Sequence, residues 1–79
     1  MPAVSITYCR PCGYHRRATY TAAQLRAELG MEADLIAGSG GVYQVRVGDV
    51  VVAGRAKGYF PDAADVVEAV RAAIRDAPA

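Results

Sequence analysis

The chain has 79 residues, a length that fits one small domain spanning 1–79. Hydrophobic residues make up 53% of the chain, which is enough for a folded core and argues against a disordered protein. The formal net charge at pH 7 is only +1, which argues against a protein built mainly to bind nucleic acid.

The N-terminal half predicts a strand, a helix and a second strand. Apolar and polar residues alternate over "AVSIT" (3–7), which predicts a strand that Tyr8 extends. From about residue 14 to residue 29 the apolar residues recur at spacings of four, three and four, which predicts a helix. Its buried stripe is Ala18, Ala22, Leu25 and Leu29. Gly30 follows at a position where helices often end, and the short apolar segment "ADLIA" (33–37) predicts a buried strand.

The C-terminal half predicts a hairpin followed by a helix. After the loop "GSGG" (38–41), "VYQVRV" (42–47) alternates as a strand does. Gly48-Asp49 is a two-residue turn that leads into the partner strand "VVVA" (50–53). Pro61 suits the first position of a helix. The buried stripe of that helix is Ala63, Val66, Val67, Val70 and Ile74.

The predicted order of elements is β-α-β-β-β-α. Its β-α-β start implies a parallel pair of strands with a right-handed crossover, and the later hairpin implies an antiparallel pair. Each helix has one apolar stripe, so we expect both to cover the same four-stranded mixed sheet, on one face. This is the arrangement of a reduced thioredoxin-like α/β fold, which lacks the helix that usually joins the two halves.

Two cysteines, Cys9 and Cys12, stand where the first strand ends and the first helix begins. Free backbone N–H groups and the positive end of the helix dipole stabilise a thiolate there, lowering the pKa of a cysteine below its free value of about 8.5. A spacing of three residues on the first turn of a helix brings two sulfur atoms close enough to bond. Pro11 limits backbone freedom and favours the start of a helix. In this β-α-β context the pair predicts thiol–disulfide redox chemistry.

The compartment bears on how the cysteines are interpreted. The segment "MPAVSITYC" (1–9) has neither the basic region nor the long apolar region of a signal peptide. No apolar run approaches the roughly 20 residues that cross a bilayer. We therefore expect a cytoplasmic protein that contacts no membrane. Structural disulfides are rare in the cytoplasm, so two cysteines there indicate a catalytic, redox-sensing or metal-binding role.

Two other interpretations of the pair stay open. A structural zinc site needs four ligands, and the chain has no further cysteine and a single histidine, His15, so zinc would require a dimer that shares two pairs. The second alternative is a pair of buried, inert cysteines. We expect no bound metal and no bound cofactor.

Basic, aromatic and small residues surround the pair. Positive charge from Arg10, His15, Arg16 and Arg17 would stabilise a thiolate or hold an anionic thiol such as glutathione. The candidate substrate-binding residues are Arg10, Tyr14, Arg16, Gly40, Gly41 and Tyr59. Each also has a plain structural interpretation, namely packing for the tyrosines, solvated charge for the arginines and a turn for the glycines. His15 is either a proton shuttle or a solvated residue in the first turn of the helix.

These residues resemble the selenoprotein W, T and H family, also called the Rdx family. The resemblance covers roughly residues 4–75 and is most specific in three motifs. They are Y-C-x-x-C-G-Y (8–14), G-x-Y-x-V-x-V-G (41–48) and G-Y-F-P (58–61). In the family the second position of the pair is selenocysteine in some members, and Cys12 matches it, with Cys9 as its partner. The resemblance implies a thioredoxin-like fold with a thiol–disulfide centre linked to glutathione.

The sequence departs from many relatives near the expected substrate groove. Gly54 and Arg55 stand where relatives often carry serine and lysine, and "GSGG" replaces a threonine-proline element. Two arguments disagree on which thiol attacks. Analogy with thioredoxins favours Cys9 as the more exposed first cysteine, whereas the family resemblance favours Cys12, where the selenium-containing members place their most reactive atom. We favour Cys12.

We therefore expect a small thiol–disulfide oxidoreductase that exchanges disulfides through a mixed-disulfide intermediate. The alternative is a redox-responsive binding module whose pair changes state without turnover. The expected partners are protein thiols or glutathione as co-substrate, with no nucleic acid and no membrane. The chain is expected to be a monomer or a weak homodimer.

Overall fold

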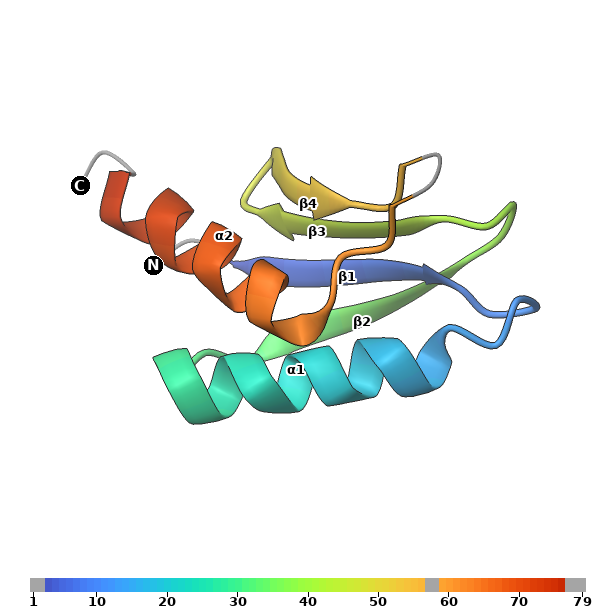
Figure 1. The fold of residues 1–79 in the computed structure, drawn as a ribbon, viewed down its shortest axis with the longest axis horizontal. Helices are drawn as coiled ribbons and strands as arrows, with labels where there is room; N and C mark the ends of the chain where they lie inside the picture. Colours follow the sequence, from blue (N-terminus) through green and yellow to red (C-terminus); the bar gives the residue numbers. More distant parts are fainter. Residues whose placement is uncertain (1–2, 57–58, 77–79) are drawn as a thin grey trace.

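The computed structural model describes residues 3–56 and 59–76. Its elements are β1 (Val4–Cys9), α1 (His15–Leu29), β2 (Ala33–Gly38), β3 (Tyr43–Val47), β4 (Val50–Gly54) and α2 (Ala63–Asp76). The predicted order β-α-β-β-β-α is confirmed (Figure 1). Gly58, the first residue of the G-Y-F-P motif, lies outside the described residues, as do both ends of the predicted 1–79 domain.

The four strands form one mixed sheet in the order β2-β1-β3-β4. β1 and β2 run parallel, as their connection through α1 predicts, and Cys9 lies opposite Gly38. β3 runs antiparallel to both β1 and β4, and Tyr8 lies opposite Tyr43. Gly48-Asp49 makes the predicted turn between β3 and β4, with Gly48 at a φ of 60°. This register sets the carboxyl end of β1 beside the start of β3.

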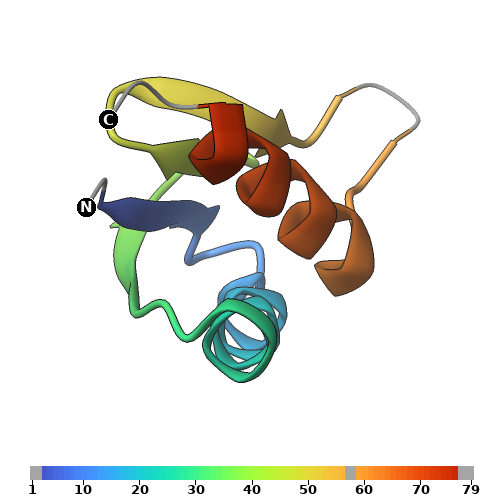
Figure 2. The ribbon, with the colours of Figure 1, turned by 90° about the vertical axis from the view of Figure 1, so that its left-hand side faces the viewer.

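The core lies between the sheet and the two helices. α1 packs against β1 and β2, and α2 packs against β3 and β4. Figure 2 shows both helices on the same side of the sheet, as predicted. The buried apolar residues of the strands are Val4, Ile6, Tyr8, Cys9, Tyr43, Val45 and Val47. Those of the helices are Ala18, Leu25, Val66, Val67 and Val70. The other members of the two predicted stripes, Ala22, Leu29, Ala63 and Ile74, are half-buried.

The strand predicted at 33–37 is confirmed as β2, but the prediction that it is buried is wrong. β2 pairs only with β1, so it forms one edge of the sheet. Leu35 and Ile36 are 37% and 47% exposed, respectively. Among the described residues, both helices lie on one face, so an edge strand is covered on that side alone. A short apolar segment does not distinguish an edge strand from a central one.

The second helix begins later than Pro61. Asp62 caps it, because the carboxylate of Asp62 accepts a hydrogen bond from the N–H of Asp65 at 2.9 Å. The carbonyl of Asp62 accepts the first bond of the helix, from the N–H of Val66 at 3.1 Å. Pro61 is buried just before this cap. Over the described residues, no helix combines the length and apolar character that a membrane span requires.

Candidate functional site

Cys9 and Cys12 are joined by a disulfide. Cys9 is the last residue of β1, and Cys12 lies in the turn that leads to α1. Their Cα atoms are 5.3 Å apart, within the usual range for bridged cysteines. The three-residue spacing therefore brings the two sulfur atoms together, as predicted.

The pair does not lie on the first turn of a helix, which corrects the sequence-based expectation. α1 begins at His15, and the preceding turn has its own hydrogen bonds. The N–H of Gly13 donates to the carbonyl of Arg10 at 3.1 Å, and the N–H of Tyr14 donates to the carbonyl of Cys9 at 3.3 Å. Gly13 has a φ of 80°, in the left-handed region, so the helix cannot extend back through it. A compact turn, rather than helical periodicity, closes the gap between the cysteines.

The two cysteines differ in exposure. Cys9 is 1% exposed, whereas Cys12 is exposed in the turn. The backbone N–H of Cys9 donates to the carbonyl of Val42 at 2.7 Å, which holds this strand end against the segment before β3. The assumption that the first cysteine is the more exposed one is therefore wrong for this chain. Another thiol can approach Cys12 and is kept away from Cys9.

The loop at 38–42 lies beside the disulfide turn. The carbonyl of Gly38 accepts a hydrogen bond from the N–H of Arg10 at 3.2 Å. On its other side, Arg55 donates from Nη1 to the carbonyl of Gly41 at 3.1 Å. A Cβ atom at Gly41 would lie 2.8 Å from that same nitrogen. Gly40 and Gly41 both have positive φ, so these two candidate residues build a tight turn next to the cysteines.

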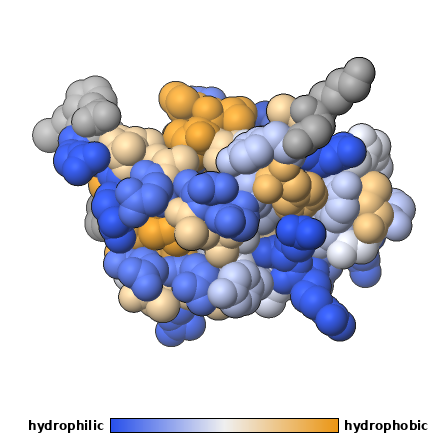
Figure 3. Space-filling view, in the orientation of Figure 1, coloured by the Kyte–Doolittle hydropathy of each residue, from blue (hydrophilic) through white to orange (hydrophobic). Residues whose placement is uncertain are grey.

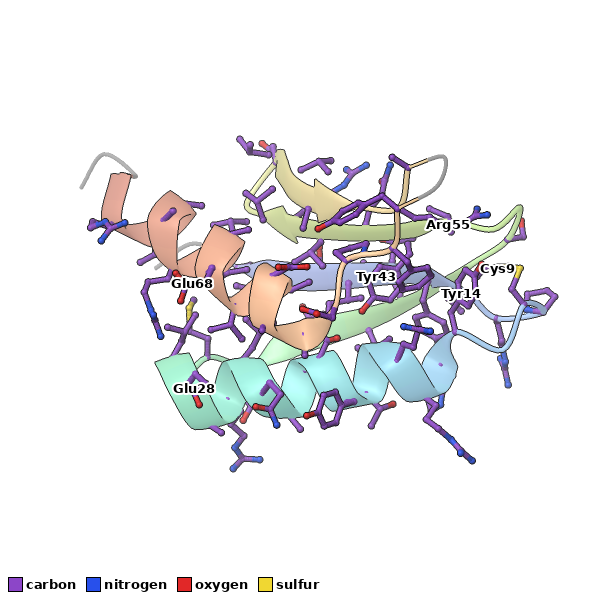
Figure 4. All side chains as sticks on the ribbon, viewed as in Figure 1. Cys9, Tyr14, Glu28, Tyr43, Arg55 and Glu68 are labelled. Atoms are coloured by element: carbon purple, nitrogen blue, oxygen red, sulfur yellow. A yellow bond between two sulfur atoms is a disulfide. The ribbon has the colours of Figure 1, made fainter. Side chains whose placement is uncertain are left out.

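Three aromatic rings pack together behind the turn. The Tyr14 and Phe60 ring centroids are 5.1 Å apart, and those of Tyr43 and Phe60 are 4.7 Å apart. Tyr14 also meets Tyr43 edge-on, with centroids 6.4 Å apart. The guanidinium carbon of Arg17 lies 4.4 Å from the centre of the Phe60 ring, a cation–π contact. Tyr14 therefore joins the disulfide turn to the core, and Figure 4 shows it near Cys9 and Tyr43.

A buried hydroxyl pair connects α1 to β3. Thr21 and Tyr43 are 3% and 1% exposed, and their hydroxyl oxygens are 3.0 Å apart. Burial raises the pKa of Tyr43 above 10.0, although the hydrogen bond with Thr21 and the charge of Arg17 act in the opposite direction. Neither residue is among those predicted from the sequence. Thr21 stands three residues after Ala18 and four before Leu25, and this spacing could have placed it in the buried stripe.

The other candidate residues occupy different surroundings. Arg10 is exposed in the turn, and Arg16 is exposed at the second position of α1. Tyr59 points elsewhere, since its hydroxyl donates to Asp65 of α2 at 3.2 Å. Partial desolvation, this hydrogen bond and the negative charges of Asp65 and Asp62 raise the pKa of Tyr59. His15 is exposed, with its ring 5.4 Å from that of Tyr8.

The potential metal ligands are scattered. Among the described residues, no three His, Cys, Asp or Glu side chains lie together in a way that could hold a metal ion. The cysteines are bonded to each other.

The mixed sheet, the two helices on one face and the disulfide after β1 define a thioredoxin-like protein with a C-x-x-C pair. Residues 3–72 match the model of the Rdx family, so the chain belongs to that family, as the motifs indicated.

Two solved structures have the same fold. A protein from Bordetella parapertussis is 31% identical with a TM-score of 0.82, over 90% of this chain and 95% of that one. A selenoprotein W-related protein from Vibrio cholerae is 26% identical with a TM-score of 0.76, over 92% of this chain and 96% of that one. None of the curated proteins matches this sequence.

Proposed function

We propose that the chain is a thiol–disulfide oxidoreductase that works through Cys9 and Cys12. The observation that carries this proposal is the disulfide itself, which joins a buried sulfur to an exposed residue at one end of the sheet. Membership of the Rdx family, with a C-x-x-C pair, supports the same chemistry. A cytoplasmic location is part of the proposal, because a reducing compartment returns such a pair to its dithiol form.

Each reaction would proceed by two thiol–disulfide exchanges. A thiolate of the partner attacks Sγ of Cys12, which becomes bonded to the partner. The bond between Cys12 and Cys9 breaks, and its electron pair leaves with the sulfur of Cys9, which takes up a proton. A second thiolate then attacks the partner's sulfur in the mixed disulfide, and Cys12 leaves as a thiolate. The two partner thiols lose two electrons, and the protons that they release on ionising go to the solvent. The cysteine pair gains both electrons and takes up one proton, at Cys9, while Cys12 remains a thiolate.

The exposures support different roles for the two sulfurs. Cys12 is accessible, so it forms the mixed disulfide, whereas Cys9 stays at the end of β1. In the reverse reaction, Cys9 attacks Cys12 in the mixed disulfide and releases a reduced partner. The reduced pair thereby delivers two electrons to a substrate disulfide. Two molecules of glutathione, or one protein dithiol, would supply these electrons. Arg10 and Arg16 would receive the carboxylates of glutathione, and the turn at Gly40 and Gly41 would let its backbone approach.

The test is turnover of a small model disulfide. Glutathione, glutathione reductase and NADPH are supplied, and NADPH oxidation is followed with the wild type and with Cys9→Ser/Cys12→Ser as the control. We expect catalytic turnover that the double variant lacks. One equivalent of reduction without turnover would instead identify a redox-responsive binding module and overturn the enzyme. Alkylation with mass spectrometry across a redox titration shows in either case whether both thiols are oxidised together.

A further inference from the structure

The start of α1 carries positive charge where a helix is least able to accommodate it. His15, Arg16 and Arg17 are its first three residues, and the first turn contains no acidic residue. Tyr14, at the N-cap position, makes no side-chain hydrogen bond to the helix. Because the N-terminus of a helix is the positive end of its dipole, cations there destabilise it. The polar side chains that normally cap such an end are missing here.

The other helix follows the usual rules. Asp62 caps α2, Asp65 lies in its first turn, and Arg75 lies in its last turn. The unfavourable arrangement is therefore confined to the helix that follows the disulfide. Departures from local stability rules are expected at functional sites, where a different requirement has decided the sequence.

Two further elements add cations at this end of the molecule. Arg10 lies in the turn between the cysteines, and Arg55 is held beside Gly41. We define the basic patch as Arg10, Arg16 and Arg55, which are all exposed. Arg17 is left out because its guanidinium covers Phe60 and because it lines a small cavity together with Asp62.

The basic patch takes part in no salt bridge among the described residues. The described segments 9–17, 38–43 and 54–56, which carry the patch, contain no aspartate and no glutamate. The nearest acidic residues on α2 are engaged elsewhere, since Asp65 accepts a hydrogen bond from Tyr59 and Asp62 caps the helix and shares the small cavity with Arg17. The two salt bridges among the described residues are Arg26–Glu32 and Arg71–Glu68, and neither involves the patch. Figure 4 shows Glu28 and Glu68 well away from Arg55 and Cys9. Figure 3 shows strongly hydrophilic side chains over the start of α1, at the lower right.

We propose that the basic patch docks an acidic segment of a partner protein, and that this segment carries the cysteine that exchanges with Cys12. Carboxylates on both sides of the partner's cysteine would pair with the guanidinium groups of the segments next to Cys12. Opposite potentials raise the rate of encounter and fix the register of the two chains. Only the exchange step rests on the proposed function, because docking through charge needs no covalent chemistry.

A protein fits this patch better than a nucleic acid. Arg10 lies in the same turn as the exposed Cys12, and Arg16 and Arg55 lie on or against segments next to that turn. A protein can bring a cysteine that reacts with this disulfide, whereas a nucleic acid cannot. The whole chain is close to neutral at +1, so it lacks the extended positive surface that tracks a phosphate backbone.

The first experiment measures docking without chemistry. Fluorescent peptides carry serine in place of the cysteine and differ only in flanking residues, which are acidic, neutral or basic. Their binding to the oxidised protein is followed by fluorescence anisotropy. We expect the acidic peptide to bind most tightly and to weaken as salt is added. Arg16→Gln should weaken it by about two- to fivefold, the range of an exposed ion pair.

Arg26→Gln is the matched control, because it removes the same charge from an exposed position near the other end of α1. It should leave the affinity for the acidic peptide unchanged. Equal affinities for the acidic and neutral peptides, or equal losses in the two variants, would overturn the proposal. So would a short single-stranded oligonucleotide that displaces the acidic peptide at lower concentration than the unlabelled acidic peptide itself.

The second experiment measures exchange with the corresponding cysteine peptides. The readout is the ratio of the rates for the acidic and basic peptides, because a general change in the reactivity of the cysteine pair moves both rates together and leaves their ratio unchanged. We expect the ratio to fall in Arg16→Gln and not in Arg26→Gln. Acidic binding without any exchange would remove the proposed function and keep the docking site. Exchange at equal rates for all peptides would keep the proposed function and remove the docking site.

Discussion

Cys9 and Cys12 share one disulfide but not one environment, since Cys9 is 1% exposed at the end of β1 and Cys12 is exposed in the next turn. The difference arises from the backbone. Cys9 is still held as part of the sheet by its hydrogen bond to Val42, whereas the turn that Gly13 closes carries Cys12 away from it. Accessibility therefore distinguishes the two sulfurs.

The reduced protein should react with alkylating reagents first at Cys12. Burial blocks the approach of the reagent to Cys9, so we expect its alkylation to be slower by on the order of tenfold. Mass spectrometry of a quenched time course identifies the site that is modified first. In the same way, Cys9→Ser should capture a mixed disulfide and Cys12→Ser should not. Faster labelling of Cys9 would contradict the assignment of Cys12 as the attacking thiol.

Gly13→Ala tests whether the turn controls the disulfide. Gly13 has a φ of 80°, and a Cβ atom there would meet no heavy atom within 4 Å. The cost is therefore conformational, about 1–2 kcal/mol in the free energy of unfolding measured with urea. Because this turn carries Cys12, we also expect the midpoint of the redox titration to shift.

Gly48→Ala is the control for that experiment. Gly48 has a φ of 60° and equally open surroundings, but it lies in the hairpin turn between β3 and β4. It should lose a similar free energy of unfolding and keep the wild-type midpoint. An equal shift in both variants would show that the midpoint follows general stability instead of the turn.

Local sequence patterns predicted the elements and the cysteine pair, but they did not predict the exposure of β2 or the backbone conformation of Gly13. Alternation and helical spacing depend on neighbouring residues, so the order of elements and the hairpin at Gly48 were correct. The exposure of β2 depends on its place in the sheet, which no local pattern encodes. The left-handed backbone of Gly13, which moves the cysteines off the helix, is one of several conformations that glycine allows.

Contacts between segments that are distant in the sequence could not be predicted from local patterns either. Arg55 meets Gly41 only because the β3–β4 hairpin returns the chain to the loop before β3. Thr21 and Tyr43 are 22 positions apart and come together only when α1 packs on the sheet. Such pairs follow from topology, so they become visible once the strand order is known.

The hydroxyl pair of Thr21 and Tyr43 should stabilise the fold as one unit. Thr21→Val leaves the Tyr43 hydroxyl buried without a partner, which costs about 1–3 kcal/mol of unfolding free energy. Tyr43→Phe likewise leaves the Thr21 hydroxyl buried without its partner. The double variant removes both polar groups, so its loss should be smaller than the sum of the single losses. Urea denaturation of the four proteins gives the coupling energy, and strictly additive losses would mean that the bond contributes nothing.

Tyr43 should also make the folded state sensitive to alkaline pH. Burial raises its pKa above 10.0 in the folded protein, whereas the phenol of an unfolded chain ionises near pH 10. As pH rises past about 10, the unfolded chain releases this proton first, so the equilibrium moves toward unfolding. The stabilisation is thus complete below about pH 10 and is lost as pH rises toward the folded pKa. Burial is the largest cause of the raised pKa, since Tyr43 is 1% exposed.

Tyr43→Phe should therefore flatten the decline of unfolding free energy above about pH 10, by at most about 1.4 kcal/mol per pH unit. Urea denaturation at a series of pH values measures the slope. Tyr20→Phe is the control, because Tyr20 is 59% exposed and its loss should leave the slope as in the wild type. Tyr59 remains in both variants, so the smaller effect of its own raised pKa is common to them. Identical slopes in Tyr43→Phe and the wild type would mean that the buried phenol ionises equally easily in the folded protein.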